Sequence, residues 1–293
     1  MEQIYNRINN HEFLSNRDIA RFIHINSNGN IRVKFITSDN SSEKAFYDPT
    51  IKSVLLDINY KTKSLKYLCE FSKKRLKILS DADKSKFLVD AYNLKLICTL
   101  FHELRHAKQM DSMSQKSSCK YVNAKKELIY LSYIFAALKP KDYKIYHDLY
   151  YHEYDAVINS FIRTLNIIDK CQNLSEDSVI EFNRFISAII YHSHGNRYPN
   201  GNEPLIFDSF KSPIVYSKHL SSSILDLESK KLLLRYVRNL KENSTTEYLK
   251  LVNGLKLSDK TLNLLHDTYA RIHSTSNLLN EIKIEQKVKI KVK

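Results

Sequence analysis

Apolar residues in the middle of the chain recur at intervals of three and four positions, which is the spacing of one face of an α-helix. No glycine or proline interrupts the chain between Asp83 and Met110, and Ser80 offers a side-chain acceptor for a helix start. We therefore predict one long helix over this stretch. Its apolar stripe consists of Phe87, Ala91, Leu94, Cys98 and Phe101.

A second helical pattern follows Pro140, a residue that ends or kinks a helix. Its apolar stripe is interrupted by a carboxylate, Glu153, which has no basic neighbour three or four positions away. An isolated charge on an apolar face is costly unless a cation or several donors compensate it. We expect this carboxylate to have a specific partner. The stripe consists of Tyr146, Leu149, Tyr150, Glu153, Ala156, Val157, Ser160 and Phe161.

Two short segments before the first helix have the patterns of strands. Residues 31–36 alternate apolar and basic side chains after an Asn-Gly-Asn turn, and residues 53–58 form a compact apolar run. Most of the remaining chain has a helical pattern, including much of the region after Asn173. The sequence therefore predicts an α+β fold that is predominantly α-helical, with a small antiparallel sheet packed on the central helices.

The segment His102-Glu103-Leu104-Arg105-His106 continues the first helical stripe and carries the clearest chemical signal of the chain. Residues i and i+4 of a helix share one face, so the two imidazoles are spaced to bind one zinc ion. Glu103 is placed to accept a proton from a water on that ion without binding the ion itself. The alternative is a set of ordinary surface helix pairs, which the apolar surroundings disfavour.

A catalytic zinc ion usually has three protein ligands, so a third must come from elsewhere in the chain. Glu153 is the first choice because of its place in the second stripe, and a modest rotation of that helix would present His152 or Asp155 instead. Asp155 is also the expected hydrogen-bond partner of a zinc histidine. The HExxHxxGxxH pattern is excluded, since Gln109 and Ser112 stand at its glycine and third-histidine positions.

These two segments together resemble the gluzincin group of zinc metallopeptidases, whose thermolysin-like members carry HExxH on one helix and a glutamate ligand on the next. The resemblance extends over about residues 51–161, and a Glu-x-x-Ala pattern of the group matches Glu153 and Ala156. Val157 stands where the group often has aspartate, which leaves the orienting carboxylate to Asp155 or to a distant residue. The resemblance implies a Zn²⁺ cofactor and a peptide or protein substrate.

The resemblance also implies how the chain is organised. We expect a zincin-like metallopeptidase domain over residues 1–170, with its sheet packed on the active-site helices, and a helical extension over residues 171–293. In the gluzincin arrangement an edge strand beside the metal pairs with an extended peptide. Residues 54–58 would be that edge strand.

A polar segment at residues 192–201 interrupts the helical patterns of the second half and is expected to form a loop. One hypothesis makes it a flap over the site, in which His192, His194 or Tyr198 donates a hydrogen bond to the oxyanion. The alternative is an exposed connection whose histidines have no such role.

The formal net charge of +14 raises the question of nucleic acid as a partner. The basic residues are spread rather than clustered, so we rank a basic helical module that binds nucleic acid or protein, with a structural or degenerate HExxH site, second to a zinc peptidase. No apolar run approaches the length of about 20 residues that spans a bilayer. With no CxxC pair and no signal-like N-terminus, we expect a soluble cytoplasmic protein of unknown oligomeric state.

Overall fold

The computed structural model describes residues 1–37, 45–113, 126, 129, 130, 133, 151–182, 185 and 258. By its internal contacts the chain forms two compact units, one of Met1–Asp111 with Ala156–Phe185 and one of Ser112–Asp155 with Ile186–Lys293. Most of the described residues belong to the first unit. The helical extension expected over residues 171–293 lies almost wholly outside the described residues.

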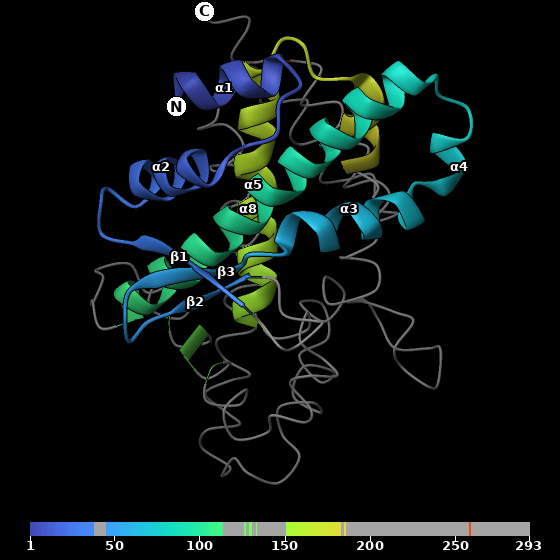
Figure 1. Cartoon of the computed structure of the whole chain (residues 1–293). Coiled ribbons are helices and arrows are strands. Elements are labelled where there is room, and N and C mark those ends of the chain that lie inside the picture. The colour runs from blue at the N-terminus through green and yellow to red at the C-terminus, as the bar shows by residue number, and fades with distance from the viewer. Residues whose placement is uncertain are drawn as a thin grey trace, which may run out of the picture. The chain divides into compact units, whose positions relative to one another are not determined.

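The described part of the chain is mostly helical, with one small sheet (Figure 1), as the sequence predicts. Among the described residues, no helix combines the length and the apolar character needed to cross a membrane. In chain order the elements are α1 (Glu2–Asn9), α2 (Asn16–Asn26), β1 (Arg32–Ile36), β2 (Ala45–Asp48), β3 (Ser53–Asp57), α3 (Tyr60–Phe71), α4 (Lys73–Leu76), α5 (Asp81–Met113) and α8 (Tyr151–Lys170).

The long helix predicted from the first apolar stripe is confirmed as α5. Its start is capped by Ser80, whose hydroxyl oxygen accepts a hydrogen bond from the backbone N–H of Asp83 at 3.2 Å. The whole predicted stripe from Phe87 to Phe101 is buried. Polar side chains on other faces of α5 are buried as well, among them Asp90 and Asn93. α5 is therefore enclosed by neighbouring elements on several sides, and Figure 1 shows α8 crossing it.

The three strands form a mixed sheet in the order β1-β3-β2. β3 pairs with β1 in parallel, with Arg32 opposite Ser53, and with β2 in antiparallel fashion, with Ala45 opposite Leu56. The expectation of an antiparallel sheet is therefore wrong for the pair β1 and β3. The sequence pattern indicated β1 and β3 as consecutive strands. In the structure, β2 lies between them in the sequence and pairs with the other edge of β3.

β3 is the central strand, and all five of its residues are buried. The expectation that residues 54–58 form an edge strand for an extended peptide is therefore wrong, because both edges of β3 are already paired. β3 ends at Asp57, which accepts hydrogen bonds from the backbone N–H of Asn59 at 2.7 Å and from Lys63 Nζ at 2.5 Å. The bonds from Lys63 and Asn59 lower the pKa of Asp57 and link the strand to the start of α3.

The sheet and the N-terminal helices share one apolar core with α5. Val54 and Leu56 of β3 belong to the same buried cluster as Leu100 and Phe101 of α5. The ring of Phe22 in α2 meets the ring of Phe101 edge to face, with 4.8 Å between the centroids. This packing fixes the backbone of α5 immediately before the HExxH segment.

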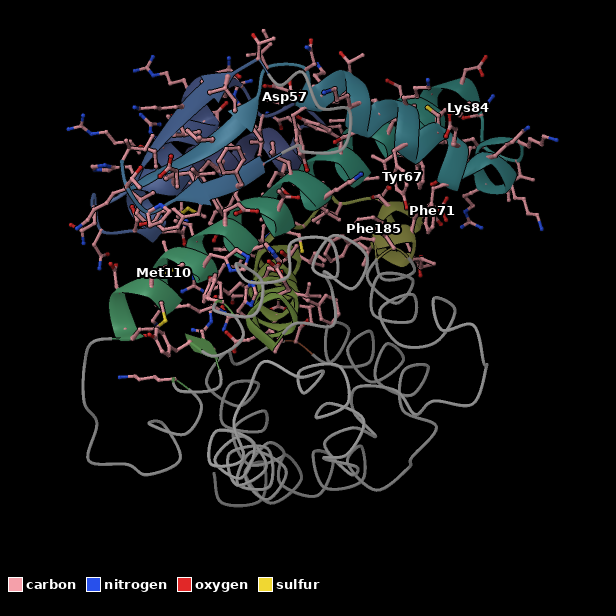
Figure 2. All side chains as sticks on the ribbon, turned by 90° about the horizontal axis from the view of Figure 1, so that it is seen from below. Asp57, Tyr67, Phe71, Lys84, Met110 and Phe185 are labelled. Atoms are coloured by element: carbon pink, nitrogen blue, oxygen red, sulfur yellow. The ribbon has the colours of Figure 1, made fainter. Side chains whose placement is uncertain are left out.

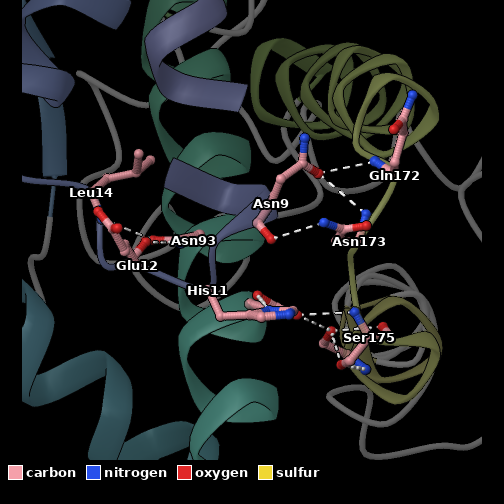
Figure 3. Close-up of polar contacts among 10 residues, drawn as sticks. Asn9, His11, Glu12, Leu14, Asn93, Gln172, Asn173 and Ser175 are labelled. Carbon is pink, nitrogen blue, oxygen red and sulfur yellow. Dashed lines mark hydrogen bonds and ion pairs between the residues drawn. The ribbon is translucent and has the colours of Figure 1, made fainter. Parts of the chain in front are cut away.

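Polar contacts tie the start of the chain and the segment after α8 to α5 (Figure 3). Asp90, whose side chain is 0% exposed, accepts hydrogen bonds from His11 Nδ1 at 3.0 Å and from the backbone N–H of Ser175 at 3.0 Å. Asn93, one turn further along α5, accepts a bond from the backbone N–H of Leu14 at 3.1 Å. We call this group the polar clasp.

Further contacts extend the polar clasp beyond α8. The Asn9 side-chain oxygen accepts hydrogen bonds from the backbone N–H groups of Gln172 at 2.9 Å and Asn173 at 3.2 Å. The chain directly after α8 is therefore bonded back to α1. The expected domain boundary at residue 170 stays a prediction.

A buried lysine on α5 is surrounded by aromatic rings from other elements. Lys95 Nζ lies 4.1 Å from the ring centroid of Tyr67 and 5.1 Å from that of Phe185. Figure 2 shows Tyr67, Phe71 and Phe185 grouped together, toward the end of α5 opposite Met110. Contact between an ammonium group and ring faces compensates part of the cost of burying the charge. We attribute a structural role to this lysine in joining α3 to α5.

Candidate metal centre

Two histidines and one glutamate come together where the sequence predicts a metal site. His102, His106 and Glu153 each offer one ligand atom, and these atoms all lie within 4.8 Å of one another. Among the described residues, they form the group of three that could hold a metal ion. α5 carries both histidines one turn apart, and the first turn of α8 carries the carboxylate.

The two imidazoles face each other through the same kind of atom. His102 Nε2 lies 3.0 Å from His106 Nε2, with the rings edge to face and their centroids 4.6 Å apart. Two nitrogen lone pairs at this distance repel each other, so either a proton or a cation must lie between them. The helix repeat alone brings these atoms together, since the residues are four positions apart.

The orientation of the second imidazole is set by a hydrogen bond to a buried amide. His106 Nδ1 lies 3.0 Å from Gln109 Oε1, and Gln109 is 1% exposed. A carbonyl oxygen can only accept, so the hydrogen of the pair is on Nδ1. A neutral His106 then presents a lone pair on Nε2, which is the protonation state a metal ligand needs.

Glu153 is buried, with 3% of its surface exposed. A carboxylate so placed is not a solvated surface group. Its Oε1 lies 3.2 Å from Nε2 of His152, which is itself buried and stacks on the ring of Tyr133 with 4.0 Å between the centroids. The carboxylate of Glu153 is therefore held from one side by an imidazole that aromatic contact keeps in place.

The remaining candidate site residues predicted from the sequence are not part of this group. The group of three includes neither His152 nor Asp155, although Asp155 is buried nearby on α8. The role of Asp155 as partner of a zinc histidine stays a prediction. His192, His194 and Tyr198, the candidate oxyanion donors, lie outside the described residues.

Sequence reasoning did not assign two residues near the site, Gln109 in contact with His106 and Tyr133 in contact with His152. Gln109 enters the sequence analysis only as a departure from another zinc motif, although a residue three positions after His106 on a helix is a neighbour of that histidine. No sequence spacing indicates the contact of Tyr133, because its ring stacks on His152 only in the folded chain. Spacing could have revealed the first contact, whereas the second required a structure.

Glu103, the expected general base, follows His102 on α5 and is 6% exposed. On the adjoining part of α5, the hydroxyl group of Thr99 donates its hydrogen to the backbone oxygen of Lys95 at 3.0 Å. The oxygen of the same hydroxyl group therefore accepts a hydrogen bond from the hydroxyl group of Tyr60 at 2.8 Å. Burial raises the pKa of Tyr60 to about 12, and the negative charge of Glu103 contributes to this rise. Tyr60 therefore stays a neutral phenol beside the buried carboxylate.

Arg163 of α8 lies near Arg105 of α5. The guanidinium of Arg163 on α8 lies over the ring of Phe101, with 5.1 Å from Cζ to the ring centroid. Burial, together with the nearby positive charge of Arg105, lowers the pKa of Arg163. Since an arginine stays protonated even so, α5 and α8 carry two neighbouring cations here.

The three donors suit a first-row metal ion. Ligand atoms around a tetrahedral zinc ion lie about 3.3 Å apart, close to the nitrogen pair's separation of 3.0 Å. Imidazole and carboxylate groups bind zinc and also related divalent ions, so the donor set is consistent with zinc without selecting it.

No protein-family model matches the chain, and neither does any curated protein or solved structure. The functional argument therefore depends on the geometry of the site.

Proposed function

We propose that the chain is a zinc-dependent metallopeptidase of the gluzincin type, which hydrolyses peptide bonds in a peptide or protein substrate. The observation that supports it most strongly is that a glutamate of α8 meets the two histidines of an HExxH segment on α5 within 4.8 Å. A second support is the burial of Glu103 beside this group. Three potential ligands and a buried carboxylate next to one of them in the sequence are the groups that metal-assisted hydrolysis requires.

In this proposal His102, His106 and Glu153 hold the ion. A zinc ion bound there supplies a Lewis acid that polarises a carbonyl group and brings the pKa of water near 7. Glu103 accepts the proton of the attacking water and passes it to the amine that leaves when the peptide bond breaks. Gln109 and His152 keep their neighbours His106 and Glu153 in orientation.

The test is the substitution Glu103→Gln in the full chain, measured on a fluorogenic peptide library. Because the amide cannot accept the proton, we expect kcat/KM to fall about 100- to 10,000-fold. Zinc content should remain at one ion per chain, since Glu103 is not a ligand. Glu70→Gln, which makes the same change at an exposed position of α3, is the matched control and should leave both quantities unchanged.

Native cleavage by the Glu103→Gln chain would show that another group is the base. If the unaltered chain bound no zinc and cleaved no peptide, the peptidase proposal would fail. Steeply salt-dependent binding of nucleic acid by such a metal-free chain would favour the second hypothesis, that of a basic binding module.

A further inference from the structure

We propose that Gln109 is a positioning residue for metal binding, which holds the proton of His106 on Nδ1 and so keeps Nε2 available as a ligand. This inference rests on the proposed metal function. It concerns the tautomer of one imidazole, a property that the HExxH pattern does not specify. The contact that carries it is the hydrogen bond of 3.0 Å between His106 Nδ1 and Gln109 Oε1.

A neutral imidazole carries one hydrogen and can place it on either nitrogen. If the hydrogen of His106 were on Nε2, this atom would have no lone pair for a metal ion. The oxygen of Gln109 accepts from Nδ1 and so stabilises the tautomer with a free Nε2. In the absence of metal, Nε2–H of His102 can then donate to Nε2 of His106 across their 3.0 Å separation. A metal ion would take the place of that hydrogen.

The surroundings of Gln109 make it an effective acceptor. Its side chain is 1% exposed, so bulk water cannot readily replace its oxygen if the amide is removed. α5 continues to Met113, so the backbone of Gln109 is held within the same helix as that of His106. Ala107, between them in the sequence, is fully buried in the apolar core and fixes the orientation of this turn.

The amide also differs from the partner that zinc histidines often have. A carboxylate in this place would orient the ring and make it a stronger base, whereas an amide orients it without adding a negative charge. Replacing Gln109 by glutamate should therefore retain the positioning and strengthen metal binding. Replacing it by methionine, which has similar length but only a weak acceptor, should remove the positioning.

The experiment measures Zn²⁺ affinity of the full chain by competition with a chromophoric chelator. We expect Gln109→Met to weaken the affinity 10- to 100-fold, at about the level seen when such orienting partners are removed elsewhere. Gln109→Glu should bind Zn²⁺ at least as tightly as the unaltered chain. Gln3→Leu, an exposed position on α1, is the control for loss of a glutamine amide and should have no effect.

A second readout is the tautomer of His106 in the metal-free chain, from nitrogen-15 NMR of the ring. We expect the Nδ1–H form in the unaltered and Gln109→Glu chains, and a shift toward the Nε2–H form in Gln109→Met. A role confined to helix packing would not produce this shift. The NMR measurement does not require zinc, so it distinguishes failure of this inference from failure of the proposed function.

Three results would overturn the inference. The first is unchanged Zn²⁺ affinity and an unchanged tautomer in Gln109→Met. The second is a loss of affinity in Gln109→Glu as large as that in Gln109→Met, because glutamate retains the acceptor. The third is an Nε2–H tautomer in the unaltered chain. If instead the unaltered chain binds no Zn²⁺ but shows the Nδ1–H form, Gln109 does set the tautomer of His106, and only the proposed metal function fails.

Discussion

The ligands proposed for the metal are held by residues that are not ligands. At the scale of single side chains, His106 is oriented by Gln109 at 3.0 Å, and Glu153 lies 3.2 Å from His152. Such contacts already restrict the side chains that would bind the ion, so these side chains lose less conformational freedom when the ion binds. The site is therefore largely preorganised by the fold.

The assignment of Glu153 as the third ligand leads to a direct prediction. Glu153→Gln should weaken Zn²⁺ binding more than about 100-fold, because an amide oxygen is a much poorer ligand for this ion than a carboxylate. Chelator competition measures the change, with Glu70→Gln as the control. If Asp155→Asn or His152→Phe abolished binding while Glu153→Gln did not, the third ligand would be one of its neighbours.

The cysteine on α5 should take no part in metal chemistry. Burial raises the pKa of Cys98 to about 11, and its Sγ lies 3.5 Å from Ser160 Oγ. At about pH 8 only roughly one molecule in a thousand would carry the thiolate, which is the reactive form. We expect iodoacetamide to label exposed Cys69 and to spare Cys98 until urea unfolds the chain, as read by peptide mass mapping. Rapid labelling of Cys98 in the folded chain would contradict its burial.

At the scale of elements, the pattern of apolar residues was sufficient for α5 but not for the sheet. A long helix without glycine or proline leaves a regular stripe, and the stripe predicted both its existence and its buried face. β2 is only four residues long, and its sequence Ala-Phe-Tyr-Asp does not alternate apolar and polar side chains. The prediction of an edge strand is wrong for β3, because a continuous apolar run indicates a strand that is buried on both faces.

The junction between β3 and α3 should respond to acid in a defined direction. The pKa of Asp57 is lowered in the folded chain, so its contribution to stability is complete above the unfolded-state pKa and is lost as the pH falls through the folded value. Asp57→Asn should therefore reduce stability at neutral pH and make unfolding less pH-dependent below about pH 4. Urea unfolding at a series of pH values measures this. Equal acid sensitivity in both chains would contradict it.

The polar clasp joins three segments that are distant in the sequence. Asp90→Ala would leave the donors of His11 and Ser175 without their acceptor, so we expect a loss of about 3 kcal/mol in the free energy of unfolding. Asp81→Ala, whose side chain is 98% exposed and paired with Lys84, should leave this free energy nearly unchanged. A similar small effect at Asp90 would show that the clasp does not stabilise the fold.

At the scale of the whole molecule, the sequence predicted the candidate ligands better than the residues around them. Two segments with helical spacing predicted His102, His106 and Glu153, because each periodicity defines a face and each face carries a chemically unusual residue. Helical spacing permits the contact of Gln109 with His106 without specifying its rotamer, and the contact of Tyr133 with His152 depends on tertiary approach, which periodicity does not encode. The candidate oxyanion donors and the C-terminal helices remain predictions, because they lie outside the described residues.

The most direct test of the account is anomalous diffraction at the zinc edge from crystals of the full chain grown with Zn²⁺. The account predicts one strong peak within bonding distance of Nε2 of His102, Nε2 of His106 and a carboxylate oxygen of Glu153. A zinc ion held by other residues, or a fully ordered triad without any peak, would contradict it.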